Sequence, residues 1–143
     1  MARKHRAVGR DVLSAWGPVV LYMAAIFVLS GLPRIPVPPG VIFTWDKVQH
    51  VIAYFGLGLV SYRAAVLKPI AGSAGPYVQA LLVSAIYGAL DEYHQSFVPG
   101  RTMSGLDWLA DFAGVLICLA VVAIVKNRRG NGGKQHVGRG SGI

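Results

Sequence analysis

The stretch YGALDEYHQSFVPGR, residues 87–101, closes a long apolar run with a dense set of charged and polar side chains. Residues 76–90 contain no charged side chain, whereas Asp91, Glu92, His94 and Gln95 then follow within five positions. Pro99 and Gly100 disfavour any continuation of the helix. Ionisable groups cost roughly 2.5–3.5 kcal/mol each at the centre of a bilayer and less near its surface, so they usually face a partner or a polar cavity. This stretch therefore predicts a membrane helix that ends in a polar site.

The composition indicates a membrane protein. Of 143 residues, 54% are apolar and only 14% are charged, whereas ordinary soluble domains carry about 25% charged residues. Helices that cross a bilayer need about 20 mainly apolar residues, and their backbone must satisfy its own hydrogen bonds. Four such segments are predicted: Leu13–Leu32, Trp45–Leu67, Pro76–Phe97 and Leu106–Val125. The expected fold is an all-α polytopic membrane protein, a bundle of four transmembrane helices.

The four segments define residues 13–126 as one membrane domain between two basic tails. Residues 1–12 are rich in Arg and Lys, and residues 127–143 combine basic residues with many glycines, a composition typical of a disordered tail. Residues 1–32 also resemble a secretory signal, but the apolar run is long for one, which favours a retained anchor.

The Lys and Arg residues predict the orientation in the membrane. Three lie in connections on one side, at Arg34, Lys47 and Arg101. The other eleven lie in the two tails and in the connection between the second and third segments: Arg3, Lys4, Arg6, Arg10, Arg63, Lys68, Lys126, Arg128, Arg129, Lys134 and Arg139. By the positive-inside rule, both termini are expected in the cytoplasm. The net charge of +8 is therefore explained by the membrane orientation. Because the sequence also has no nucleic-acid recognition motif, we expect no nucleic-acid partner.

Helical spacing predicts that the polar residues of three segments meet. In each segment they recur every three or four positions, which places them on one face. The three sets are Asp46, His50 and Tyr54; Tyr87, Asp91 and Gln95; and Asp107, Asp111 and Gly114. Because all three sets lie near the same predicted membrane edge, antiparallel packing brings them to one depth. The residues expected to bind a ligand there are Asp46, Lys47, His50, Tyr54, Asp91, Glu92, Gln95, Arg101, Asp107 and Asp111.

The chemistry of this set leaves three interpretations open. Asp46, His50 and Asp91 are candidate ligands of a divalent cation such as Mg²⁺, Mn²⁺ or Zn²⁺. Arg101 and Lys47, with Arg34, are suited to an anionic headgroup. The same residues are also suited to a hydrogen-bonded ion-pair network that holds the helices together, the interpretation that the lack of a strict metal motif favours.

An enzymatic role also remains open. In that interpretation His50 is a general acid or base oriented by Asp46, and Glu92 holds a metal or relays protons. Nothing in the sequence decides whether the protein is an enzyme.

Two segments resemble the signature blocks of VanZ-like membrane proteins: DKVQHVIAY, residues 46–54, and YGALDEYHQSFVPGR, followed by Asp107. The resemblance covers residues 12–126, although the family often has Asn where this chain has Asp111. It implies a small multi-pass protein of the bacterial cytoplasmic membrane with a role in the cell envelope, since the founding member is associated with resistance to the glycopeptide antibiotic teicoplanin. The expected function is an outward-facing polar site that binds a lipid or cell-wall component and influences teicoplanin susceptibility. The alternative is a small intramembrane enzyme or carrier for lipid-linked phosphate, with or without a metal ion.

Overall fold

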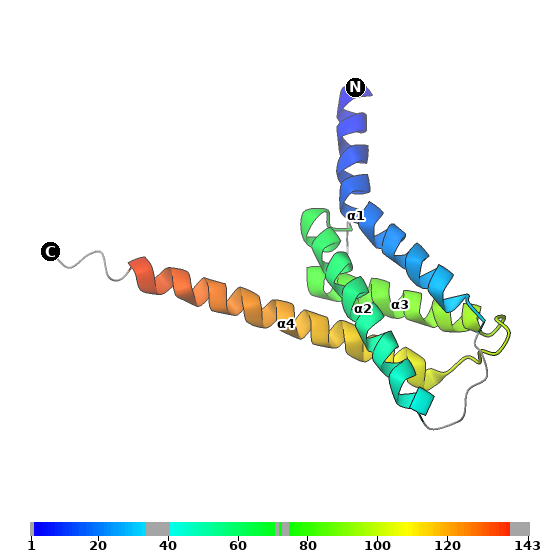
Figure 1. Ribbon diagram of the computed structural model, residues 1–143. Helices are drawn as coiled ribbons and strands as arrows, with labels where there is room; N and C mark the ends of the chain where they lie inside the picture. The colour runs from blue at the N-terminus through cyan, green and yellow to red at the C-terminus, as the bar shows by residue number, and fades with distance from the viewer. Residues whose placement is uncertain (1, 34–40, 71, 73–74, 138–143) are drawn as a thin grey trace.

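The computed structural model describes residues 2–33, 41–70, 72 and 75–137. This part of the chain consists of four helices and contains no strand: α1 (Ala2–Ser30), α2 (Val41–Leu67), α3 (Pro76–Gln95) and α4 (Gly105–Val137) (Figure 1). The all-helical fold predicted from the sequence is confirmed. Among the described residues, three segments are long and apolar enough to cross a membrane, namely Asp11–Ser30, Trp45–Leu67 and Gly105–Arg129.

The connection between α3 and α4 begins where the sequence predicts a helix break. The backbone N–H of Arg101 donates to the Val98 carbonyl at 3.1 Å, which closes a turn with Pro99 and Gly100 at its centre. Gly100 has a φ of 77°, a backbone conformation that glycine adopts without steric cost. The turn therefore returns the chain toward the end of α3 and starts α4 beside it.

The helix α4 extends beyond the boundary predicted from composition. Its backbone stays helical to Val137, whereas a disordered tail was expected from residue 127 onward. Once a helix is nucleated, each further residue adds one hydrogen bond, so an anchored helix readily propagates past the segment that packs. Residues 138–143 lie outside the described residues.

Helix α2 is the centre of the bundle. It packs most extensively against α4, then against α3 and α1. The core between these helices is formed by Val19, Ile26, Tyr54, Leu57, Tyr62, Ala64, Ala80, Val115 and Leu119. Hydrogen bonds attach α1 to the rest of the bundle, among them one from the Trp16 indole to the Lys68 carbonyl at 2.9 Å and one from the Tyr87 hydroxyl to the Met23 carbonyl at 2.6 Å.

Gly114 allows α2 and α4 to approach each other closely. A Cβ atom at this position would overlap the Val51 carbonyl oxygen and would lie 3.0 Å from the Phe55 backbone nitrogen. Both atoms belong to the backbone of α2, so no side-chain rotation would relieve the overlap. The absence of a side chain here sets the spacing of the pair that carries most of the polar residues.

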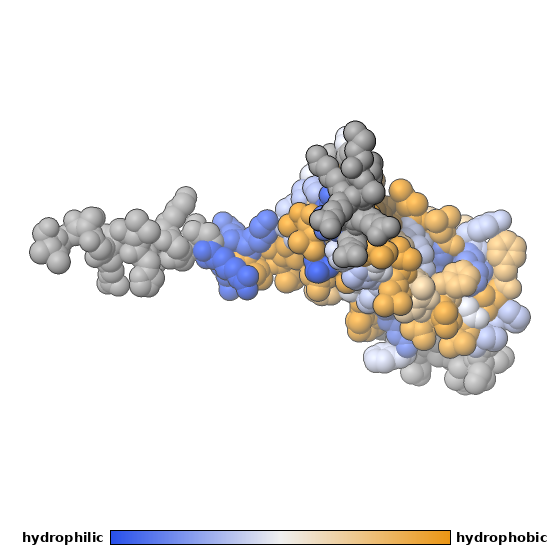
Figure 2. Space-filling view, turned by 90° about the horizontal axis from the view of Figure 1, so that it is seen from above, coloured by the Kyte–Doolittle hydropathy of each residue, from blue (hydrophilic) through white to orange (hydrophobic). Residues whose placement is uncertain are grey.

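The outer surface of the molecule is largely apolar. Figure 2 shows hydrophobic residues over most of the helical body and a hydrophilic stretch where α4 leaves it. Large apolar side chains such as Leu21, Ile52 and Leu109 are more than half exposed. A lipid environment accounts for this surface better than water does, because soluble proteins rarely expose contiguous apolar patches of such extent.

Candidate functional site

The polar residues gather at one end of the bundle. At this end α1 and α3 finish while α2 and α4 begin, and the two chain termini point away from it (Figure 1). Of the ten predicted ligand-binding residues, eight are buried, with exposures of 9% or less: Asp46, His50, Tyr54, Asp91, Glu92, Gln95, Asp107 and Asp111. Lys47 and Arg101 are partly buried at the same end. The predicted meeting of the three polar faces is therefore present in the structure, whereas Arg34 lies outside the described residues.

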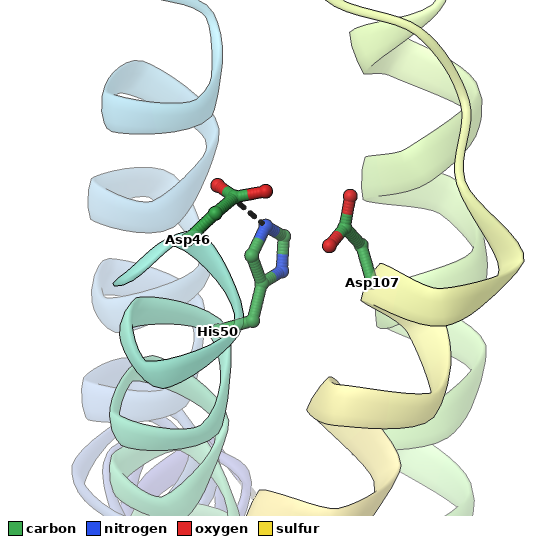
Figure 3. A group of neighbouring side chains, drawn as sticks. All are labelled: Asp46, His50 and Asp107. Atoms are coloured by element: carbon green, nitrogen blue, oxygen red, sulfur yellow. Dashed lines mark ion pairs between the residues drawn. The ribbon is translucent and has the colours of Figure 1, made fainter. Parts of the chain in front are cut away.

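His50 lies between carboxylates of two helices. Its Nδ1 atom is 2.8 Å from Asp111 Oδ1 on α4, and its Nε2 atom is 4.0 Å from Asp46 Oδ1 on α2. Figure 3 shows Asp46 and His50 directed across the gap toward Asp107. The sequence predicted Asp46 as the residue that orients His50, but Asp111 is the closer partner, because Gly114 brings α4 against α2.

The contact with Asp111 determines which nitrogen of the His50 ring carries a proton and which one faces the rest of the site. An ionised carboxylate only accepts hydrogen bonds, so Nδ1 is the protonated nitrogen in this contact when Asp111 is ionised. This leaves Nε2 directed toward Asp46. A histidine held by a carboxylate on one side, with its other nitrogen facing polar groups, is an arrangement suited to binding a ligand or transferring a proton.

The Lys47 side chain points toward the buried carboxylates of the polar site and is only 20% exposed. Its ammonium forms an ion pair with Asp107 and lies 3.6 Å from Asp46 Oδ2. One cation thus serves two buried carboxylates and joins the first turn of α4 to α2. Such a pairing lowers the cost of placing both acids out of water.

A chain of hydrogen bonds joins α1, α3 and the connection that follows α3. Asp91 accepts hydrogen bonds from Ser30 Oγ at 2.6 Å and from Gln95 Nε2 at 2.9 Å. Gln95 Oε1 in turn accepts one from Arg101 Nη1 at 3.0 Å, and Arg101 Nε donates to the Leu32 carbonyl at 3.2 Å. These bonds fix Arg101 at the mouth of the cluster.

The sequence analysis did not assign Ser30 to the site. The available signal was its position, since Ser30 is the last residue of its helix and therefore lies at the same membrane edge as the acids. His94, likewise not assigned to the site, stacks on Phe27 of α1 with ring centroids 4.0 Å apart. Both residues hold α1 against α3 where the cluster forms.

Glu92 organises the start of α4. Its Oε2 atom accepts a hydrogen bond from the Ser104 backbone N–H at 2.7 Å, and Ser104 Oγ accepts one from the Asp107 backbone N–H at 3.3 Å. Ser104 thus caps the first turn of α4, as serine commonly does at this position. Glu92 Oε1 and Asp111 Oδ2 are buried without a hydrogen-bond partner.

Two adjoining cavities open among these residues. They share Asp46, Gln95 and Arg101 in their walls. The larger has a volume of about 370 Å³ and is lined by Ile26, Leu29, Ser30, Asp46, Gln49, His50, Ala53, Tyr54, Asp91, Gln95 and Arg101. The smaller, of about 220 Å³, is lined by Asp46, Lys47, Gln95, Gly100, Arg101, Thr102, Ser104 and Asp107. The larger cavity is thus lined by both polar and apolar side chains.

Two groups of potential metal ligands occur among the described residues. One consists of Asp46, His50 and Asp107, and the other of His50, Glu92 and Asp111. Asp91, a metal candidate from the sequence, belongs to neither group, and both of its oxygens already accept hydrogen bonds.

These features define an all-helical membrane protein with a buried polar site at one end of its bundle. The family model described as VanZ/LLP1 matches residues 13–126, and the chain belongs to this family. A search of curated proteins and a search of solved structures each found no match.

Proposed function

We propose that all four helices cross the bacterial cytoplasmic membrane, with both termini in the cytoplasm and the polar site facing outward. The eleven-to-three distribution of Lys and Arg supports this orientation. In this arrangement residues 13–126 are the membrane domain, and residues 1–12 and 127–143 are cytoplasmic tails.

The helix α3 is the one described helix that is not among the three segments apolar enough to cross a membrane, but its surface suits a membrane. Asp91 and Glu92 are buried at 3% exposure, so neither faces the surroundings. Its outward face is apolar, with four residues spaced one turn apart that are 44–60% exposed: Val78, Leu82, Ile86 and Leu90. Twenty residues of helix are about 30 Å long, the thickness of a bilayer core.

The proposed function is that of a cell-envelope protein whose outward site binds a lipid or a lipid-linked cell-wall component. The observation that carries this proposal is the larger cavity, whose lining combines buried polar groups with the apolar residues Ile26, Leu29 and Ala53. An amphipathic ligand needs both kinds of surface, a polar one for its headgroup and an apolar one for its chain.

Arg101 is the residue best placed to recognise an anionic headgroup. It lines both cavities, and its hydrogen bonds to Leu32 and Gln95 hold it at their common wall. A guanidinium binds phosphate through two parallel hydrogen bonds, which a lysine ammonium does not reproduce. A lipid-linked phosphate therefore fits the chemistry of the site, and sequestering or masking such a component would influence teicoplanin susceptibility.

Thermal unfolding of the purified protein in detergent tests this proposal with two ligands of equal chain length, a polyprenyl phosphate and the corresponding polyprenol. The phosphate should stabilise the wild type by about 2.7 kcal/mol at a concentration one hundred times its Kd, and the alcohol should stabilise it much less. Arg101→Lys should lose this difference.

The matched control is Arg63→Lys, the same substitution at an exposed residue near the opposite end of α2, and it should behave as the wild type does. Equal stabilisation by phosphate and alcohol in the wild type would contradict recognition of the phosphate.

The contact between His50 and Asp111 favours a second candidate, a small intramembrane enzyme or carrier for lipid-linked phosphate. A carboxylate that orients an imidazole is a common arrangement for a general base, and His50 lines the larger cavity. If the protein is a hydrolase, the wild type in nanodiscs should release inorganic phosphate from a polyprenyl diphosphate, and His50→Gln should not.

A further inference from the structure

The two groups of potential metal ligands differ in what already balances their charge. In the group of Asp46, His50 and Asp107, the Lys47 ammonium pairs with both carboxylates. In the group of His50, Glu92 and Asp111, one potential ligand atom from each residue lies within 4.8 Å of the other two. Among the described residues, neither Glu92 nor Asp111 forms an ion pair with a Lys or Arg.

Each of these two acids also keeps one unsatisfied oxygen. Glu92 and Asp111 are only 3% and 1% exposed, yet Glu92 Oε1 and Asp111 Oδ2 have no hydrogen-bond partner. Their second oxygens are engaged, by the Ser104 backbone N–H and by His50 Nδ1. A buried carboxylate oxygen without a partner is costly, and among the described residues the His50 imidazole, beside Asp111, is the only basic side chain within ion-pair distance of either acid. Each of the two acids therefore has an oxygen that lacks a hydrogen-bond donor.

We infer that His50, Glu92 and Asp111 form a binding site for one divalent transition-metal ion. One imidazole and two carboxylates are ligands typical of Zn²⁺ and Mn²⁺, whereas Mg²⁺ prefers oxygen ligands alone. Two ligands that each lie about 2.1 Å from a tetrahedral zinc ion are about 3.4 Å apart, so His50 Nδ1 and Asp111 Oδ1, now 2.8 Å apart, become neighbouring ligands when they separate by about 0.6 Å. The ion replaces the proton that His50 shares with Asp111.

The backbone of α3 leaves space for this arrangement. A Cβ atom at Gly88, one turn before Glu92, would lie 3.3 Å from Asp111 Oδ2 and 3.2 Å from the Tyr54 ring. The missing side chain lets the carboxylate of α4 approach α3, where Glu92 projects one turn later. The three ligands come from three helices, α2, α3 and α4. The inferred metal site does not depend on which ligand occupies the larger cavity.

Zinc retention tests this inference on the full chain, purified without a polyhistidine tag. The protein is stripped with a chelator, reloaded with Zn²⁺, desalted, and analysed by mass spectrometry for bound metal per chain. The wild type should retain one Zn²⁺, and equimolar Mg²⁺ should not displace it. Glu92→Gln and Asp111→Asn preserve side-chain size and should each weaken zinc binding at least about tenfold.

Two control variants separate this site from other acids. Asp11→Asn alters an exposed acid of α1 and should retain zinc as the wild type does, whereas Asp46→Asn, which alters the other ligand group and the carboxylate facing His50 Nε2, should retain more zinc than Glu92→Gln does. Circular dichroism of each variant establishes that it is folded, and Co²⁺ substitution gives a second readout through its visible absorption, which should disappear in Glu92→Gln.

Three results would overturn the inference: a wild type that loses all zinc on desalting, full retention by both Glu92→Gln and Asp111→Asn, or loss in Asp46→Asn equal to that in Glu92→Gln. None of them affects the lipid-phosphate test, which depends on Arg101.

Discussion

Replacing Gly114 by alanine should destabilise the bundle, because the new methyl group would enter the space occupied by the backbone of α2. The added Cβ would overlap the Val51 carbonyl oxygen, with the Val51 carbonyl carbon at 3.1 Å and the Phe55 nitrogen at 3.0 Å. These atoms move only if a whole helix moves. Inserting one methyl group into a packed interior costs about 1–3 kcal/mol, and alanine returns roughly 0.5–1 kcal/mol through its higher helix propensity.

Gly58→Ala is the matched control on the same interface. A Cβ at Gly58 would meet its nearest atoms, on Val115 and Cys118, at 3.4 Å, which is ordinary van der Waals contact. Gly58→Ala should gain the higher helix propensity of alanine without a steric overlap. It should therefore be as stable as the wild type or slightly more stable.

Unfolding in detergent, followed by circular dichroism, measures the difference between the two variants. We expect Gly114→Ala to lie at least about 1 kcal/mol below Gly58→Ala, with the His50–Asp111 contact disturbed as a consequence. Equal stability of the two variants would refute the reasoning that Gly114 sets the spacing of α2 and α4.

Two further predictions concern topology and phenotype. Reporter fusions after Lys68 and at the C-terminus should register as cytoplasmic and one near Pro38 as external, because the basic residues favour that orientation; an external C-terminus would reverse the side on which the polar site faces. In a Gram-positive host where the wild type confers teicoplanin tolerance, His50→Gln, Asp91→Asn and Arg101→Lys should accumulate in the membrane at near wild-type levels yet lose the tolerance. Retention of tolerance would argue against the site, and loss of the proteins from the membrane would assign these residues a structural role.

Much of the architecture was predictable from local patterns. Runs of apolar residues mark the helices, Pro99 and Gly100 mark the break after α3, and the spacing of the polar residues identifies the face on which they lie. These features depend on neighbouring positions in the chain, so a single sequence contains them.

The partners within the site could not be predicted in the same way. Whether His50 meets Asp46 or Asp111 depends on the distance between α2 and α4, which the backbone contact at Gly114 sets. The inward direction of Lys47 depends on the position of Asp107 across the same interface, and the bond from Ser30 to Asp91 depends on how α1 leans on α3. Helical periodicity assigns residues to faces but does not determine the rotation of one helix against another.

The distribution of unsatisfied groups helps to separate a working site from a structural network. Lys47 balances Asp46 and Asp107, and Asp91 accepts two hydrogen bonds. A network selected only to join helices is expected to satisfy its buried acids throughout, since each unsatisfied one lowers stability. Glu92 and Asp111 each keep one buried oxygen without a hydrogen-bond partner, and His50, which contacts Asp111, lines the larger cavity. These unsatisfied oxygens support a site that takes up a ligand, and zinc retention in Glu92→Gln against Asp46→Asn measures whether that ligand is a metal ion.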